Sequence, residues 1–243
     1  MNKIISSPKE LSEREKFQQL YKDCPIPTDE LMYNMGLFIS RQNMMRILFI
    51  HELYQKILPV HGVIMEFGVR WGGNMALYES FRGIYEPYNY NRKIIGFDTF
   101  NSFPSLDEKD GNHSLDEMAL TENYDEYLEQ ILYYHETESP ISQIKKFELV
   151  KGDAIETIPQ YFKRHPETIV SFIYLDFDIY EPTKAALLAL KGHLTKGSII
   201  VFDELNHSDW PGETIAVQEI LGLENYRLHH SRYSPTASYI IFE

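Results

Sequence analysis

The sequence contains one cysteine, Cys24, in 243 residues. A single thiol excludes an internal disulfide, so the fold must depend on a packed core. Basic residues are also scarce: Lys and Arg number 23 against 36 for Asp and Glu, which gives a formal net charge of -13. The sequence has no Lys/Arg-rich run that could follow a phosphate backbone, and this argues against nucleic acid as a partner.

Long apolar runs are missing as well. The longest apolar stretches, such as residues 47–50, are far too short to cross a membrane as a helix. The first ten residues carry too short an apolar part for a secretory signal. We therefore expect a cytoplasmic protein with no membrane partner.

What the sequence does contain is typical of a globular protein. Hydrophobic residues make up 43% and aromatic residues 14% of the chain, enough to build a substantial core. Residues 1–60 are predicted to form a helical extension, because apolar side chains between Leu31 and Ile57 recur at helical spacing. Residues 61–243 are predicted to form the main domain.

From residue 62 onward, strand-like and helix-like patterns alternate. Strands are expected at 63–67, 93–97, 147–150, 169–175, 198–202, 226–230 and 238–242, and helices at 74–85, 123–134, 153–165, 182–191 and 214–221. Strands that alternate with helices imply right-handed crossovers and a parallel sheet. The expected fold is a doubly wound α/β domain.

Two pairs of acidic residues directly follow two of the most apolar runs: Asp176 with Asp178, and Asp203 with Glu204. Because the carboxyl ends of parallel strands meet at one edge of a sheet, where such sheets bind ligands, these carboxylates are expected to gather there. Gathered carboxylates repel one another unless a hard cation such as Mg²⁺ joins them. The alternative is that each pair merely ends a strand or caps the next helix.

A strand, a glycine-bearing turn and a helix start occupy residues 63–74. Gly68 and Gly72 let the backbone bend and approach a ligand, and the free N–H groups where the helix starts at Asn74 favour an anion. The spacing is not the Gly-x-Gly-x-x-Gly of a dinucleotide site. Glu66 would repel a polyphosphate and suits an ammonium group. An ammonium group at Glu66 and a carboxylate at the helix start describe the amino-acid part of S-adenosylmethionine.

Two further acids follow the next strands. Asp98 is placed to accept hydrogen bonds from both hydroxyls of a ribose. Asp153 is placed where it could accept one from an adenine amino group. Each also suits a local role, Asp98 as a turn cap and Asp153, with Glu156, as a capping box. The residues alone leave both roles open.

Four motifs, in this order, resemble the macrocin O-methyltransferase family, which methylates sugar hydroxyls of macrolides. They are Glu66-Phe-Gly-Val-Arg-Trp-Gly-Gly73, Gly96-Phe-Asp-Thr-Phe-Asn-Ser-Phe-Pro104, Leu175-Asp-Phe-Asp-Ile-Tyr-Glu-Pro-Thr183 and Gly197-Ser-Ile-Ile-Val-Phe-Asp203. The resemblance spans roughly residues 31–222. It implies a class I methyltransferase fold, a Rossmann-like, seven-stranded, mostly parallel sheet whose last strand is antiparallel. It also implies S-adenosylmethionine as the donor and a catalytic Mg²⁺ or another divalent cation.

By position, the resemblance implies Asp176, Asp203 and Glu204 as metal ligands. It implies that Glu66, Gly68, Asp98 and Asp153 surround the cofactor. Gly72 in the turn and Asn74 at the helix start are the other candidate cofactor residues. One departure is Glu204-Leu205, where the family usually shows Asp-Tyr, so the third ligand has a longer arm.

Methyl transfer to a hydroxyl needs a group that takes the hydroxyl proton. His207 and Asp178 are the candidate bases, and Asp176 is catalytic through the cation that it would hold. The expected acceptor is a small hydroxylated, sugar-like molecule. Residues 101–143 are long enough for a lid or a contact in a homo-oligomer, and Trp210 could form a wall of the acceptor site.

Other classes of function stay open. A metal-dependent hydroxylase or hydrolase on the same sheet would use the acids without a methyl donor. A calcium loop could begin at Asp176, although Tyr180 replaces its third acid. A non-catalytic scaffold would keep only the cofactor pocket. Binding of S-adenosylmethionine separates the methyltransferase from the hydrolase.

Overall fold

A computed structural model describes residues 6–243. By its internal contacts the chain forms two compact units, which divide between Arg46 and Ile47. The first unit contains α1 (Pro8–Lys22), α2 (Thr28–Tyr33), the 3₁₀ helix η1 (Met35–Leu37) and the start of α3 (Arg41–Ile57). No side chain in residues 6–46 is buried. The contacts thus divide the chain within α3. The predicted boundary at residue 60 stays a prediction.

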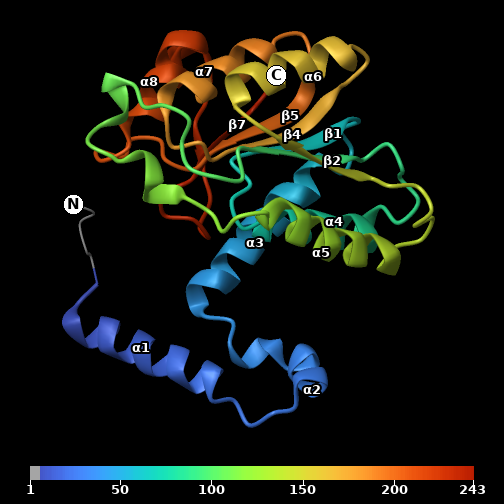
Figure 1. The fold of residues 1–243 in the computed structure, drawn as a ribbon. Helices are drawn as coiled ribbons and strands as arrows, with labels where there is room; N and C mark the ends of the chain where they lie inside the picture. Colours follow the sequence, from blue (N-terminus) through green and yellow to red (C-terminus); the bar gives the residue numbers. More distant parts are fainter. Residues whose placement is uncertain (1–5) are drawn as a thin grey trace. The chain divides into compact units, whose positions relative to one another are not determined.

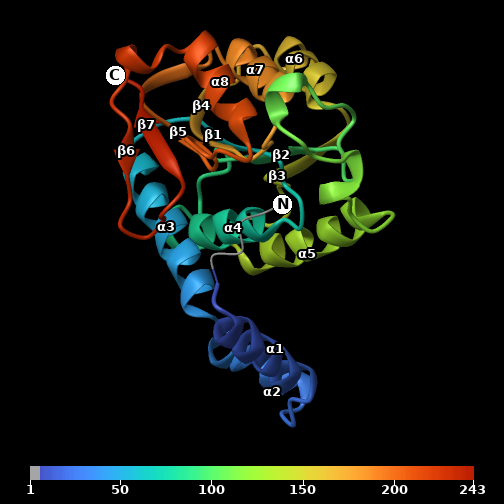
Figure 2. The same ribbon diagram turned by 90° about the vertical axis from the view of Figure 1, so that its left-hand side faces the viewer.

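A seven-stranded sheet forms the centre of the second unit. Its strands are β1 (Val63–Phe67), β2 (Ile94–Asp98), β3 (Phe147–Lys151), β4 (Val170–Leu175), β5 (Leu194–Phe202), β6 (His229–His230) and β7 (Ser238–Ile241). They lie in the order β3-β2-β1-β4-β5-β7-β6; β1 to β5 are parallel, and β7 is antiparallel to both of its neighbours (Figure 2). The predicted doubly wound fold with an antiparallel last strand is confirmed. Because the strand order reverses at β1 and β4, a ligand is expected beyond their carboxyl ends.

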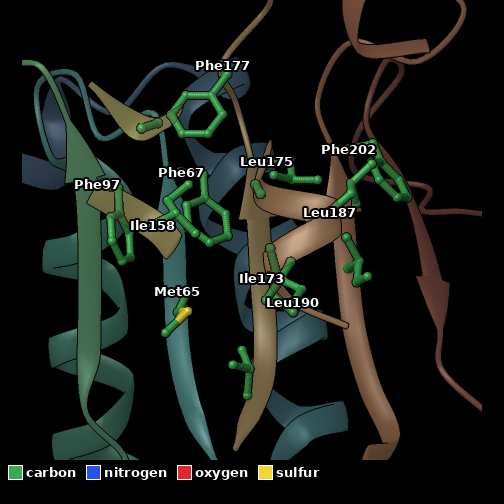
Figure 3. Packing of buried hydrophobic residues seen from close by; sticks show 14 of the residues in the cluster. Met65, Phe67, Phe97, Ile158, Ile173, Leu175, Phe177, Leu187, Leu190 and Phe202 are labelled. Carbon is green, nitrogen blue, oxygen red and sulfur yellow. The ribbon is translucent and has the colours of Figure 1, made fainter. Parts of the chain in front are cut away.

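Helices cover both faces of the sheet (Figure 1). One face carries α6 (Ala154–Arg164), α7 (Tyr180–Ala189) and α8 (Pro211–Ile220), and the other carries the second half of α3 with α4 (Gly73–Tyr85) and α5 (Tyr124–Glu138). Met65 and Phe67 pack toward the first set of helices, as Figure 3 shows, while Ile64 faces the second set. Since both faces are buried, the strands are almost wholly apolar, and the acids at their ends stand out.

Some elements differ from their predicted bounds. The fifth strand begins at Leu194 rather than at residue 198, and the strand predicted at 226–230 is reduced to His229–His230. The last helix begins at Pro211 instead of residue 214, because proline suits the first helical position. Among residues 6–243, no helix combines the length and apolar character that a membrane span requires.

A cluster of charged side chains is buried between α4, α5 and the start of β3. Arg82 contacts both Glu79 and Glu136, and Lys146 also contacts Glu136. These four residues are at most 1% exposed, so loss of one partner would leave an uncompensated buried charge. Burial raises the pKa of Glu79 to about 7, although the Arg82 charge opposes the shift.

Glu79 should make the free energy of unfolding depend on pH. Because its pKa rises from 4.5 to about 7 on folding, the folded protein binds more protons than the unfolded chain between these values. The stability that Glu79 contributes is therefore fully present below pH 4.5 and is lost as the pH rises to about 7. Urea unfolding across this range measures the loss. The Glu79→Gln variant, which cannot ionise, should lose less stability than wild type; an equal or larger loss would contradict the shift.

Candidate active site

The loops that follow β1, β2, β4 and β5 each contain a non-glycine residue with a positive φ. These are Arg70 (φ 50°), Phe100 (φ 52°), Asp178 (φ 62°) and Asn206 (φ 65°). Non-glycine residues adopt this conformation at an energetic cost, and such residues cluster at functional sites. The parallel strands bring all four loops to one edge of the sheet. The candidate site lies at this edge.

Asp98, at the end of β2, fixes two of these loops. One carboxylate oxygen accepts the backbone N–H of Arg70 at 2.8 Å, and the other accepts that of Phe100 at 2.6 Å. Burial raises the pKa of Asp98, although these backbone hydrogen bonds oppose the shift. The observed role of Asp98 is therefore to hold the two strained residues in place. The predicted contact of Asp98 with a ribose stays a prediction.

The glycine turn after β1 is shaped by its neighbours in the fold. A Cβ atom on Gly68 (φ 90°) would lie 1.9 Å from the backbone oxygen of Asp176, so only glycine lets the ends of β1 and β4 come this close. A Cβ atom on Gly72 would collide with Leu128 of α5. These glycines thus serve close packing of the chain, a reason that the sequence analysis did not foresee.

Beneath this turn, Glu66 and Asn74 lie together. Both are only 2% exposed, and the Asn74 amide donates to a carboxylate oxygen of Glu66 at 2.9 Å. On the neighbouring β3 side, Asp153 is the N-cap of α6 and accepts the backbone N–H of Ile155 at 2.9 Å. The side-chain cap that the predicted capping box assigned to Asp153 is therefore present. The cofactor contacts predicted for these residues stay predictions.

Three of the predicted acids influence one another electrostatically beyond β4 and β5. Burial raises the pKa of Asp178 to about 7, and the charges of Glu204 and Asp203 add to the shift. Burial and the Asp203 charge likewise raise the pKa of Glu204. Asp203 also accepts a hydrogen bond from the Tyr174 hydroxyl at 2.5 Å, which orients its carboxylate. The three acids therefore lie close enough to interact electrostatically.

This cluster has the chemistry of a divalent-cation site. Its donors are carboxylate oxygens, which hard cations prefer, and Glu204 Oε2 is buried without a hydrogen-bond partner. Within residues 6–243, however, no three Asp, Glu, His or Cys side chains stand together in an arrangement that could hold a metal ion. The assignment of Asp176, Asp203 and Glu204 as ligands stays a prediction. The predicted base His207 places Nδ1 3.6 Å from Glu204 Oε2.

Glu213, on the first turn of α8, is a part of the cluster that the sequence analysis missed. It is fully buried, and its Oε1 accepts the backbone N–H of Glu204 at 3.0 Å. Burial raises its pKa well above the ordinary value, and the charges of Asp203, Asp178 and Glu204 add to the shift. The one available sequence signal was its position three residues after the helix N-cap, where an acid usually caps the helix itself.

Part of the long segment 101–143 is fixed beside the cluster. Asp110, in the 3₁₀ helix η2 (Glu108–Asp110), is 1% exposed and accepts the backbone N–H of Tyr180 at 2.6 Å. The His113 ring stacks on Trp210 with centroids 3.3 Å apart and planes 4° apart, and Nε2 lies 2.7 Å from the Asp209 carbonyl oxygen. Residues 107–113 are therefore docked against α7 and α8. One face of Trp210 is covered by His113 and is not available to an acceptor.

Comparisons with known proteins agree with this fold. The family model of macrocin-O-methyltransferase (TylF) matches residues 28–222. One similar crystal structure is that of CalS11, calicheamicin methyltransferase. The sequences are 40% identical, the alignment covers 98% of this chain and 94% of the CalS11 chain, and the TM-score is 0.94. The apo structure of CalS11, described as a TDP-rhamnose 3'-O-methyltransferase, is 39% identical, covers 98% and 96% of the two chains, and has a TM-score of 0.87.

A more distant structure, that of the O-methyltransferase NovP, is 17% identical over 82% of this chain and 79% of its own, with a TM-score of 0.63. At this identity the similarity shows the fold alone. No curated protein sequence matches the chain. The family match over most of the chain and the 40% identity to CalS11 lead to one conclusion. The chain belongs to the macrocin O-methyltransferase family and is an enzyme of the O-methyltransferase class.

Proposed function

We propose that this enzyme transfers the methyl group of S-adenosylmethionine to a sugar hydroxyl, with a divalent cation, Mg²⁺, at the site of transfer. The observation that carries the proposal is the group of mutually repelling carboxylates, Asp178, Asp203 and Glu204, at the same sheet edge as the glycine turn after β1. The group suits a cation, and the turn suits a cofactor with an amino-acid end.

The proposed acceptor is a sugar that carries a nucleoside diphosphate. This follows from CalS11, which is described as a TDP-rhamnose 3'-O-methyltransferase and is 39% identical over 98% of this chain. A small, soluble acceptor of this kind requires neither a membrane nor a nucleic-acid partner. The sequence has no Lys/Arg-rich run that could follow a phosphate backbone, which agrees with the second point.

The residues proposed to bind S-adenosylmethionine come from β1, β2 and the loop after β3. Glu66 would meet the ammonium group, and Asn74 and the free N–H groups at the start of α4 would meet the carboxylate. Gly68 and Gly72 keep the turn free of side chains. Asp98 would accept from the ribose hydroxyls, and Asp153 from the adenine. The cofactor, when bound, supplies an activated methyl group.

The residues proposed to hold the cation are Asp176, Asp203 and Glu204. The cation, when bound, would chelate the acceptor hydroxyls and lower the pKa of the one that reacts. Glu204 keeps one buried carboxylate oxygen without a hydrogen-bond partner, which is the observation that favours its part in the site.

Asp178 is the base that we propose. Its carboxylate is buried, and its pKa of about 7 suits a group that takes up a proton near neutral pH. Asp178 would accept the hydroxyl proton while the acceptor oxygen bonds to the methyl carbon. The carbon–sulfur bond of the cofactor would break in the same step as the new bond forms, and its electron pair would stay on sulfur. His207 is the second candidate for the base, because it lies beside Glu204.

For the chain as a whole, we propose that residues 61–243 are the catalytic domain and that residues 1–60 are a helical extension. We propose that the helical extension makes the contacts between copies of the chain in a homo-oligomer. Apolar side chains with large exposed fractions, Leu20 at 65% and Met32 at 67%, favour this role for it.

Binding of the demethylated cofactor tests the donor assignment. S-adenosylhomocysteine at 100 times its Kd should stabilise the folded protein by about 2.7 kcal/mol, and differential scanning fluorimetry would report this as a higher Tm. The Asp98→Asn variant should show a smaller rise. A wild-type Tm that does not change at any concentration of S-adenosylhomocysteine would contradict the proposed cofactor site.

A further inference from the structure

Glu213 is held in an unusual way for an acid at the start of a helix. It is the third residue of α8, after Trp210, which is the N-cap and provides no side-chain cap. In that position a glutamate usually turns back to the N-cap backbone. Here Glu213 Oε1 accepts the backbone N–H of Glu204 at 3.0 Å instead. The acid that would usually cap the helix therefore holds the loop that carries Asp203 and Glu204 instead.

The second carboxylate oxygen of Glu213 is unsatisfied. Glu213 is fully buried, and Oε2 has no hydrogen-bond partner. A buried polar group without a partner is destabilising, and one explanation for such a group is a water molecule or an ion that completes it. The charges that act on this carboxyl group are those of Asp203, Asp178 and Glu204. All three are negative, so a cation placed among these carboxylates would be stabilised.

A neighbouring side chain on the same turn provides a comparison. Thr214 Oγ1 accepts the backbone N–H of Asn206 at 2.9 Å, and Asn206 has a positive φ of 65°. The first turn of α8 therefore holds the loop after β5 at two points, Glu204 and Asn206. Only one of the two side chains, Glu213, keeps a buried oxygen without a partner. The Thr214 contact is therefore purely structural, whereas Glu213 also has an acceptor oxygen that a ligand could use.

We propose that Glu213 is a positioning residue of the divalent-cation site: Oε1 fixes the backbone of Glu204, and Oε2 accepts hydrogen bonds from water molecules that surround the bound cation. The inference rests on the proposed cation and goes beyond it, because it assigns a residue outside the ligand set. Partners of this kind orient the ligands of a metal, and their loss typically costs 10- to 100-fold in metal affinity.

Binding of Mn²⁺ to the full chain, followed by electron paramagnetic resonance of the free ion, tests the inference without any need for turnover. Glu213→Gln keeps an oxygen for the Glu204 N–H but turns the second acceptor into an NH₂ donor, in a side chain of the same shape. We expect its Kd for Mn²⁺ to rise by about 10- to 100-fold. Thr214→Val, which disturbs the same loop, and Gln218→Ala, an exposed site on α8, should change the Kd by less than about threefold.

The affinity for S-adenosylhomocysteine should be the same in all of these proteins, which would show that each variant is folded. An unchanged Mn²⁺ Kd in Glu213→Gln, while wild type binds Mn²⁺, would overturn the inference and leave the proposed cation intact. A Thr214→Val effect as large as that of Glu213→Gln would also overturn it, because loop structure alone would then explain the loss. If wild type itself binds no Mn²⁺, the proposed cation and this inference both fail.

Discussion

The Asp203→Asn variant is expected to lose roughly 1,000-fold in kcat. A divalent cation contributes several kcal/mol to the stabilisation of a transition state, and about 4 kcal/mol corresponds to this factor. Asparagine keeps the shape of the side chain and still accepts from the Tyr174 hydroxyl, so the change removes one negative charge and little else. The measurement is kcat for methyl transfer at saturating cofactor and Mg²⁺.

Two measurements make the result for Asp203 specific. S-adenosylhomocysteine should bind to the variant as it does to wild type, because the cofactor residues belong to other loops. The Tyr174→Phe variant removes the hydrogen-bond donor to Asp203 and leaves the carboxylate in place, so a far smaller loss is expected. An Asp203→Asn enzyme with wild-type kcat would refute the part assigned to the cation.

The Asp178→Asn variant is expected to lose about 100- to 10,000-fold in kcat, which is the usual contribution of a positioned base. Asparagine cannot take up the proton of the acceptor hydroxyl. Asp178 is only 9% exposed, and its backbone has a positive φ of 62°, a conformation that asparagine tolerates. The variant should therefore fold, and its KM for the acceptor should change much less than its kcat.

A parallel His207→Gln variant decides between the two candidate bases. If Asp178 is the base, His207→Gln should retain most of the activity, and the exposed control Asp116→Asn should retain all of it. A larger loss in His207→Gln than in Asp178→Asn would move the role to His207. Far-ultraviolet circular dichroism on each variant shows whether the fold is intact.

The fold could be predicted from the sequence because its signals are local. The central strands β1, β2 and β4 are buried on both faces, so a short apolar run such as Val63–Phe67 marks each of them directly. Where burial ends, the signal weakens. The strand predicted at 226–230 is only two residues long in the structure, since a two-stranded edge needs less apolar surface than the centre of the sheet.

Much of the candidate site could not be predicted, because it depends on contacts between segments far apart in the sequence. Asp110 contacts the N-terminus of α7, and His113 stacks on Trp210. Nothing local marks either residue. Arg92 is a similar case: its guanidinium donates to the carbonyl oxygens of Ile57, Val60 and Gly62, which the fold alone brings together. The acids that end strands were visible in the sequence, whereas the groups that position them were not.

The central claim is methyl transfer to a sugar hydroxyl at a cation-dependent site. The most direct measurement incubates the purified enzyme with S-adenosylmethionine, Mg²⁺ and TDP-rhamnose, and follows both S-adenosylhomocysteine and the mass of the sugar. We predict equal amounts of S-adenosylhomocysteine and of a sugar with one added methyl group. When a chelator removes the cation, we predict that neither product forms. Full turnover in the presence of the chelator would contradict the role of the cation, and no methylation of TDP-rhamnose or of any related sugar would contradict the claim itself.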